Sequence, residues 1–203
     1  RQALDEHQAI RHDSAQLSEQ EILEKIGAQE TQAEGLFFPD TYYFSSGMSD
    51  LDILRRAYLA MQKRLEAAWA ERDPLLPYHS PHEVLIMASI VEKETGQASE
   101  RPMIAGVFVN RLRINMRLQT DPTVIYGLGE SFDGNLRRTD LLADTPYNTY
   151  TRYGLPPGPI AMPGWGALQA AVHPAATKAL YFVGKGDGTH KFSSNLAEHN
   201  LAV

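Results

Sequence analysis

Two carboxylates stand at the end of the most apolar stretch of the chain, in the sequence ASIVEKETG at residues 88–96. Glu92 and Glu94 follow a run, residues 84–91, in which Ser89 is the one polar residue. A carboxyl group held against an apolar wall has a raised pKa, because burial disfavours its charged form, and it can act as a general acid near neutral pH. The alternative is a solvated last turn in which both glutamates face water, where Glu is usually found.

Helical spacing does not decide between these alternatives. Each glutamate lies three or four residues after an apolar residue, so neither belongs clearly to a polar face. Glu92 and Glu94 are two positions apart, which separates them by about 200° around a helix. They therefore cannot face one another across one site, as the two carboxylates of a retaining glycosidase do. We expect at most one of them to lie in a cleft.

A second group of polar residues lies in the sequence RLQTDPTVIYG at residues 117–127. Gln119, Thr120 and Asp121 precede Pro122, and a residue before proline is disfavoured in a helix. These side chains could line a cleft. Alternatively, Asp121 and Thr123 cap a short helix that follows.

The third group is the sequence PYNTY at residues 146–150. Tyr147 and Tyr150 offer flat aromatic faces, and Asn148 offers a side-chain amide. Ligand sites combine apolar or aromatic walls with a few aimed polar groups, and this mixture suits a sugar. On its own the pattern indicates no more than a glycan-processing enzyme.

The composition excludes several other classes of protein. The net charge is −6, which argues against a general nucleic-acid binder. The sequence has no cysteine, its histidines lack metal-ligand spacing, and it has no nucleotide-binding motif, so we expect no metal and no cofactor. No stretch reaches the ~18 apolar residues of a membrane span. The chain begins at Arg1, which is compatible with a piece of a longer protein.

The elements that must position these residues are mainly helices. Capping boxes predict helices that begin after Ser18 and Ser80, the second running to about Thr95. Further helices are predicted over residues 50–72, 99–114 and 164–172, and one that starts at Ser194. Residues 34–44 are β-prone, residues 180–193 predict a hairpin, and residues 115–165 form a long irregular region. We therefore predict an α+β fold, with a helical core and short strands or hairpins at both ends.

Several long stretches, in this order, resemble one known family. They are ASIVEKETG, VFVNRLRINMRLQTDPTVIYGLG, YNTYTRYGLPPGPIAMPG and HPAATKALYFVGKGDGTHKFSSNLAEHN. Together with residues 34–44 they resemble the bacterial endolytic murein transglycosylases, the YceG-like proteins. The resemblance implies a YceG-like catalytic domain at residues 34–203, and a remnant of a LysM-like subdomain or a linker at residues 1–33.

The resemblance also implies a location and partners. Proteins of this family are held at the inner membrane by a single N-terminal helix, which this chain lacks, with the catalytic domain on the periplasmic side. They cut nascent peptidoglycan glycan strands internally, without a metal or cofactor. The family further suggests cooperation with glycan-polymerising penicillin-binding proteins.

The resemblance favours Glu94 as the catalytic residue. In related lytic transglycosylases a hydroxyl residue follows the catalytic glutamate, and Glu94-Thr95 matches this pair, whereas Glu92 is followed by Lys93. The segment Gln119 to Asp121 is similar in position to a cleft-lining motif that contains glutamine. The pair Tyr147-Asn148 is similar to a Tyr-Asn motif of that wider group.

The reaction that the resemblance implies is a cut without water at the bond between N-acetylmuramic acid and N-acetylglucosamine. Glu94 would act first as acid and then as base, and a 1,6-anhydro end would form. The expected substrate-binding residues are Thr95, Gln119, Thr120, Asp121, Tyr147, Asn148 and Tyr150. Two alternatives remain, an inverting glycosidase that uses Glu94 and Asp121, and a peptidoglycan-binding scaffold without activity.

Overall fold

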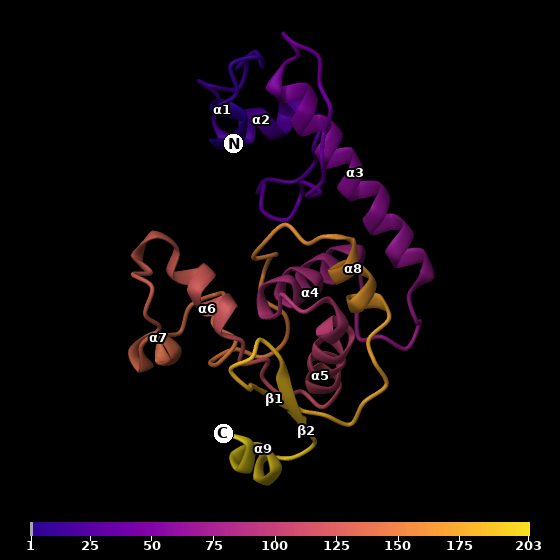
Figure 1. Ribbon diagram of the computed structural model, residues 1–203, viewed down its shortest axis with the longest axis vertical. Coiled ribbons are helices and arrows are strands. Elements are labelled where there is room, and N and C mark those ends of the chain that lie inside the picture. Colours follow the sequence, from indigo (N-terminus) through magenta and orange to yellow (C-terminus); the bar gives the residue numbers. More distant parts are fainter. Residues whose placement is uncertain (1) are drawn as a thin grey trace.

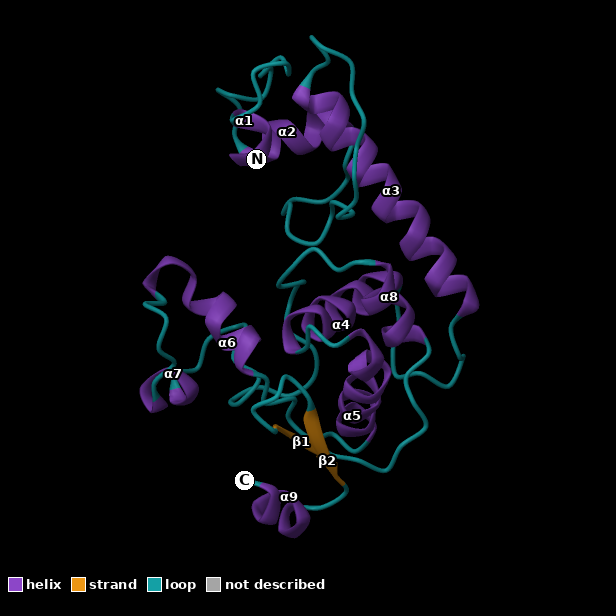
Figure 2. Cartoon of the chain, in the orientation of Figure 1, coloured by secondary structure: helices purple, strands orange, loops and turns teal. Residues whose placement is uncertain are grey.

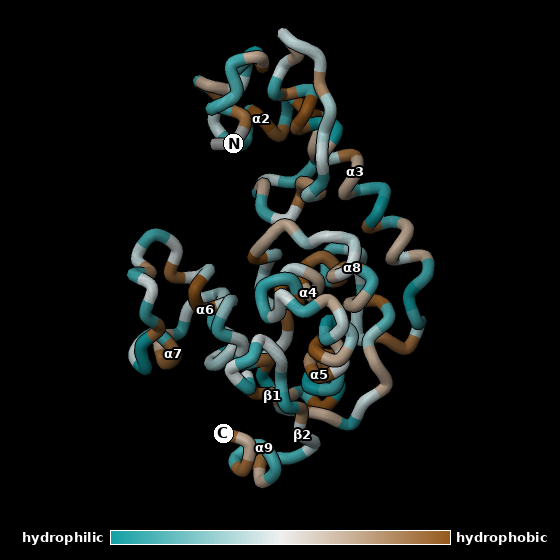
Figure 3. The backbone as a smooth tube through the Cα atoms, viewed as in Figure 1, coloured by the Kyte–Doolittle hydropathy of each residue, from teal (hydrophilic) through white to brown (hydrophobic). Residues whose placement is uncertain are grey.

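A computed structural model describes residues 2–203 and shows a mainly helical protein (Figures 1 and 2). Three helices lie at its centre: α4 (Pro81–Glu94), α5 (Arg101–Arg113) and α8 (Trp165–Val172). The longest helix, α3 (Asp50–Glu71), runs along one side and contacts both α4 and α8. Figure 3 shows hydrophobic residues gathered along α5 and α8, and alternating polar and apolar residues along α3. No helix within residues 2–203 is both long and apolar enough to cross a membrane.

Helix α4 is buried on all sides. The eight consecutive residues from Val84 to Val91 are each at most 3% exposed. Ser89, the polar residue among them, is satisfied because its hydroxyl donates to Ile86 O (2.7 Å) and accepts from Ile160 N (3.0 Å). The helix begins as predicted, with Ser80 accepting from the backbone of Glu83. The Glu83 carboxylate binds the backbone N–H of His79 (2.6 Å) rather than that of Ser80, so the predicted capping box is shifted by one residue.

The N-terminal part of the chain packs on α3. Helix α1 (Gln2–Asp5) is short, and α2 (Glu19–Ile26) has the predicted capping box of Ser18 and Glu21. Arg55 of α3 donates to the carbonyls of Lys25 and Ile26 at the end of α2. Residues 2–33 are thereby tied to the long helix.

The predicted α+β class is confirmed, with its sheet at one end of the chain. Strands β1 (Tyr181–Gly184) and β2 (His190–Ser193) form the expected antiparallel hairpin, and α9 (Leu196–Ala202) follows. The expected strands near the N-terminus are absent from the described residues, where residues 34–44 form no strand. Phe38 N–H instead donates to Ala57 O in α3 (3.0 Å), and Pro39 has no N–H to give. This segment packs on a helix and not on a partner strand.

The region 115–165 is more regular than its sequence predicts. It contains α6 (Asp121–Leu128) and α7 (Arg138–Leu142), and a single 3-10 turn, η2 (Gly129–Ser131), follows α6. Another 3-10 turn, η1 (Ala98–Glu100), precedes α5. Helix α6 contacts α4, so this region is attached to the core at the point where α4 ends.

Gly106 in α5 allows a close approach between this helix and the segment that leads to β1. A Cβ at this position would lie 2.7 Å from Ala175 O and 2.9 Å from Thr177 Cγ2. We expect Gly106→Ala to lower the free energy of unfolding by about 1–2 kcal/mol, because overpacking outweighs the better helix propensity of alanine. Thermal denaturation tests this, with Gly96→Ala as control, since its Cβ would meet nothing within 4 Å. A stabilised Gly106→Ala variant would contradict the expectation.

Candidate active site

The two glutamates at the end of α4 occupy different environments. Glu92 accepts a hydrogen bond from Gly164 N (3.0 Å) at the start of α8, and it forms an ion pair with Arg101 (3.4 Å). A carboxylate at a helix N-terminus is stabilised by the unpaired N–H groups there. Glu92 therefore joins α4 to α8 and α5, which is a structural role.

Glu94 points to the other side, toward the start of α6. Its carboxylate accepts a short hydrogen bond from the Thr120 hydroxyl. Burial raises the pKa of Glu94, the Thr120 hydrogen bond acts to lower it, and the nearby Asp121 carboxylate acts to raise it. The residue nevertheless remains partly exposed, so a ligand can reach it. These are the properties of a general acid.

Two other threonines, Thr123 and Thr149, hold Thr120 in place through a ring of hydrogen bonds. Thr120 N–H donates to the Thr149 hydroxyl (3.0 Å), and the Thr123 hydroxyl donates to Thr120 O (2.7 Å). The hydroxyls of Thr123 and Thr149 are 2.9 Å apart. Because Thr123 already gives its proton to Thr120 O, Thr149 is the donor between them. The ring satisfies the backbone of Thr120 and leaves its own hydroxyl to donate to Glu94.

The backbone before Thr120 is in an unusual conformation. Gln119 has φ of +47°, a left-handed value that costs a non-glycine residue about 1 kcal/mol. Its N–H donates to Thr149 O (3.1 Å), which holds this turn against the 146–150 segment. Thr120 takes the N-cap position of α6 but makes no side-chain cap, and its hydroxyl donates to Glu94. The Gln119 side chain is exposed beside this turn.

Asp121 and Tyr150 form a second hydrogen-bonded pair near Glu94. The Tyr150 hydroxyl donates to Asp121. Burial, this hydrogen bond and the charges of Asp121 and Glu94 all raise the pKa of Tyr150, so its phenol stays neutral. Two of the expected residues thus meet close to the carboxyl group that Thr120 holds.

The C-terminal hairpin forms the opposite wall of a pocket over Glu94. This pocket, which we call the Glu94 pocket, has a volume of about 350 Å³. Residues 94–96 line one side, and the GKGDG turn with its neighbours lines the other: Gly184, Gly186, Gly188, Thr189 and His190. Three glycines over the carboxyl group leave room where side chains would fill it. The sequence pattern indicates only a turn there.

His190 is fixed in this wall by Glu100. Its Nδ1 lies 2.7 Å from one Glu100 oxygen, and its backbone N–H donates to the other (2.9 Å). Burial acts to raise the pKa of Glu100, but the pKa is lowered because these hydrogen bonds outweigh burial.

Arg111 adds a buried cation near Glu94. It donates to Leu118 O and Leu180 O, and so links the residue before β1 to the turn before Thr120. Both His190 and Arg111 act electrostatically to lower the pKa of Glu94.

Comparison with known proteins identifies the family. The model of the YceG-like family matches residues 2–203. The chain belongs to the YceG-like family. A protein of Bacillus subtilis (strain 168) named endolytic murein transglycosylase is 42% identical over 170 residues, which cover 83% of this chain and 46% of that protein.

Two further relatives agree with this assignment. A protein of Streptococcus pneumoniae serotype 2 with the same name is 30% identical over 90% of this chain and 34% of its own length. A crystal structure of a YceG-like protein from Listeria monocytogenes is 35% identical with a TM-score of 0.69, and the match covers 89% of this chain and 61% of that one. The chain thus spans less than half the length of the curated relatives it matches.

In this YceG-like chain, two residues expected in the site lie elsewhere. Tyr147 packs against Tyr126 of α6, with ring centroids 4.8 Å apart, and lines a different pocket. Asn148 is fully buried, and its amide donates to the carbonyls of Asp140, Leu141 and Ala143. Its oxygen accepts from Tyr150 N (2.8 Å). Asn148 therefore shapes the segment that carries Tyr150, and it is not free to contact a sugar as we expected.

Thr95 has a local role in addition to its place in the Glu94 pocket. Its hydroxyl accepts from Gln97 N (2.9 Å), in the turn that ends α4. The expected site residues that the structure brings together are therefore Glu94, Thr95, Thr120, Asp121 and Tyr150, with Gln119 at the edge.

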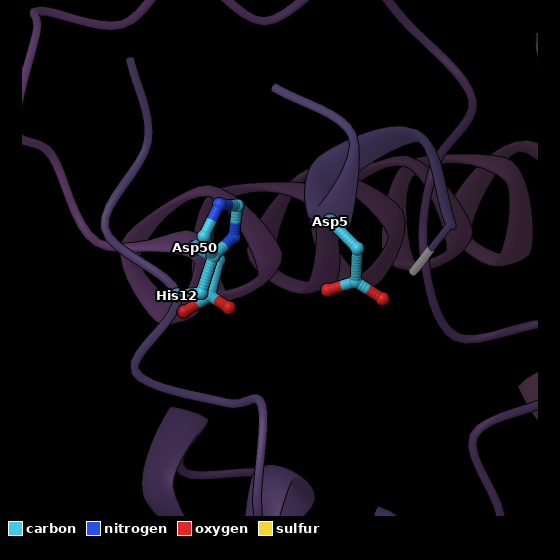
Figure 4. A group of neighbouring side chains, drawn as sticks. All are labelled: Asp5, His12 and Asp50. Atoms are coloured by element: carbon cyan, nitrogen blue, oxygen red, sulfur yellow. The ribbon is translucent and has the colours of Figure 1, made fainter. Parts of the chain in front are cut away.

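One group of possible metal ligands lies far from this pocket, near the N-terminus of α3 (Figure 4). Ligand atoms of Asp5, His12 and Asp50 lie within 4.8 Å of one another, although their spacing in the sequence gives no sign of it. The Asp50 carboxylate already accepts from Ser14 N, the Ser14 hydroxyl and Leu51 N. These hydrogen bonds join residues 2–17 to α3, which explains the buried aspartate without an ion.

The environment of Asn148 predicts a loss of stability when its amide is changed. We expect Asn148→Asp to lower the free energy of unfolding by about 3 kcal/mol or more, because a carboxylate would face three carbonyl oxygens. Thermal denaturation measures this, and the exposed Asn135→Asp variant is the control, with an expected change within about 0.5 kcal/mol. A stable Asn148→Asp variant that had lost ligand binding would instead make Asn148 a contact residue.

The neighbours of Glu94 predict opposite changes in its pKa. Thr120→Val removes a hydrogen bond to the carboxylate, so the pKa should rise further. Asp121→Asn removes a nearby negative charge, so the pKa should fall toward the ordinary value of 4.5. Carboxyl NMR titration of labelled glutamate measures both. Thr95→Val is the control, since that hydroxyl binds Gln97 N, and shifts in the same direction for Thr120→Val and Asp121→Asn would refute this account.

Proposed function

We propose that this chain is the catalytic part of an endolytic transglycosylase that cleaves peptidoglycan glycan strands. The observation that carries the proposal is a single carboxyl group of raised pKa, Glu94, held by Thr120 in an accessible pocket. The names of the Bacillus and Streptococcus relatives support the reaction and its substrate.

In the proposed reaction Glu94 acts twice. Its neutral carboxyl group first protonates the glycosidic oxygen between N-acetylmuramic acid and N-acetylglucosamine, and the C1–O bond breaks. An oxocarbenium-like centre develops at C1 of the muramic sugar, which its own acetamido oxygen can stabilise. The Glu94 carboxylate then takes the proton from the C6 hydroxyl of the same sugar as that oxygen bonds to C1. A 1,6-anhydro ring forms, and Glu94 regains its proton.

One carboxyl group suffices because the nucleophile belongs to the substrate. A hydrolase needs a second carboxylate, either as nucleophile or to activate water. Here the C6 hydroxyl is carried by the same sugar as C1 and can reach it across the ring, so proximity replaces the second group. This agrees with the different position of Glu92, whose carboxylate is used by Gly164 and Arg101.

The residues around Glu94 would orient the sugars and balance charge. When Glu94 becomes a carboxylate, the Thr120 hydroxyl and the positive charge of Arg111 stabilise it. Tyr150 and Asp121 would position the sugar beside the acid, with Gln119 and Thr95 at the edges. Asn148 would contribute only through the position of Tyr150.

The alternative of an inverting glycosidase rests on Asp121. It lies close enough to Glu94 to influence the pKa of that residue, and it would serve as the base that activates water. That enzyme would leave hydrolysed reducing ends. The reaction products therefore separate the two mechanisms.

We further propose the setting that family membership suggests. Residues 34–203 would form the catalytic domain on the outer side of the inner membrane, and residues 1–33 would be the end of a LysM-like subdomain or a linker. Glycan strands are the proposed substrate, and penicillin-binding proteins that polymerise them are proposed partners. The net charge of −6 is consistent with a partner other than nucleic acid.

Mass spectrometry of digested glycan strands tests the reaction and the role of Glu94 together. Wild-type protein should give products lighter by one water molecule than the hydrolytic ones. Glu94→Gln should lower the rate by about 10²–10⁴-fold, the usual contribution of a general acid and base. Glu92→Gln is the matched control and should retain most of the activity, because a glutamine oxygen can still accept from Gly164 N.

Other outcomes assign the chemistry differently. Hydrolysed ends would favour the inverting mechanism and Asp121. Cleavage by Glu94→Gln but not by Glu92→Gln would make Glu92 the acid. If the wild-type protein binds glycan strands but leaves them intact, it is a scaffold.

A further inference from the structure

A second and larger pocket lies at the other end of α6 from Glu94. It has a volume of about 640 Å³ and lies between α2, the segment 32–37 and α6, and we call it the Tyr126 pocket. None of the residues that line it takes part in the proposed reaction. Those used below are Glu19, Glu34, Phe37, Tyr126, Tyr147 and Met162.

The charge in the Tyr126 pocket has one sign. Glu19 and Glu34 are the charged residues of its lining, and no lysine, arginine or histidine among the described residues lines it. Glu19 accepts from Ala33 N (2.8 Å). Burial raises the pKa of Glu34, a backbone hydrogen bond at Gly35 acts to lower it, and Glu19 acts to raise it. Lys93, an exposed residue outside the lining, acts to lower the pKa of Glu34, and its effect is the smallest of these.

The same pocket carries aromatic rings beside the carboxylates. Tyr126 and Tyr147 pack at an angle of 55°, and Phe37 lines the pocket with them. Burial, with Glu34 and Tyr147 nearby, raises the pKa of Tyr126 to about 12, so its phenol adds no charge. Ring faces attract cations, and the attraction is strongest where water is partly excluded. Carboxylates and ring faces together favour an organic ammonium group.

We propose that the Tyr126 pocket binds a primary ammonium group carried by a peptide that is attached to the glycan strand. The nature of this carrier rests on the proposed function. Tyr126 lies six residues after Thr120 in the same helix, a rise of about 9 Å. A strand held at Glu94 would therefore bring its peptide substituents to this pocket. The site would select strands whose peptides still have a free amine.

Binding can be measured without catalysis. Met162 lines the pocket, so its labelled methyl group reports a ligand by NMR. We expect Nα-acetyl-lysine methylamide to shift this signal in a saturable manner, and its Nε-acetylated form to leave it unchanged. Glu34→Gln should weaken binding roughly tenfold, in the range of a partly desolvated charge contact. Glu24→Gln, an exposed change in α2, is the matched control.

Three results would overturn the proposal. The first is no shift with either compound, and the second is equal shifts with both. The third is a shift caused by peptide-free glycan but not by the amine, which would make the pocket a sugar subsite. Retained thermal stability of Glu34→Gln establishes that a loss of binding is local.

Cleavage assays then test the use of the pocket on strands. Wild-type protein should cleave strands with free peptide amines roughly tenfold faster than strands with acetylated amines, and Glu34→Gln should remove this preference. Equal cleavage of both strands by wild type would refute the inference while the proposed function stands. Amine binding at Met162 without cleavage of any strand would refute the proposed function while the ammonium site stands.

Discussion

The burial of residues 84–91 on every side of α4 is the constraint on which the other elements depend. A helix that is apolar on every side must be covered on every side, and α3, α5, α6 and α8 each contact it. Its covering helices fix its rotation as well as its position. The last turn, where the sequence becomes polar, therefore presents each side chain in one definite direction.

This fixed rotation gives two neighbouring glutamates different chemistry. Glu92 meets the N-terminus of α8 and Arg101, which together stabilise its charge. Glu94 lies in a buried environment that raises its pKa, and the Thr120 hydroxyl that it contacts offsets only part of this effect. Glu92 and Glu94 are the same residue type, and they differ because their environments differ, as is common where two carboxyl groups lie close in a protein. The ring of threonines also contributes, because it holds Thr120 where its hydroxyl donates to Glu94.

The sequence predicted best those features that depend on neighbours along the chain. The start of α4 at Ser80, the capping box at Ser18 and the amphipathic α3 all follow from local patterns, and the structure has them. The β-prone segment 34–44 fails because its side chains pack on α3, which no local pattern shows.

Residues brought together from distant parts of the chain were predicted least well. Thr149 gives no signal in the sequence, since its importance arises from contacts with Thr120 and Thr123. The sequence places His190 in a hairpin, but it does not show that this residue contacts Glu100 and lines the same pocket as Glu94. Asn148 was expected to offer its side-chain amide to a sugar, but that amide donates to three backbone carbonyls. Spacing within one segment cannot report such contacts.

The hairpin that closes the Glu94 pocket determines when this pocket can form during protein synthesis. Glu100 and His190 are 90 positions apart, and the glycine turn lies between the two strands near the C-terminal end. During synthesis Glu94 of α4 emerges from the ribosome long before the hairpin that faces it. The pocket is therefore incomplete on a growing chain until this hairpin has been synthesised and has folded over Glu94.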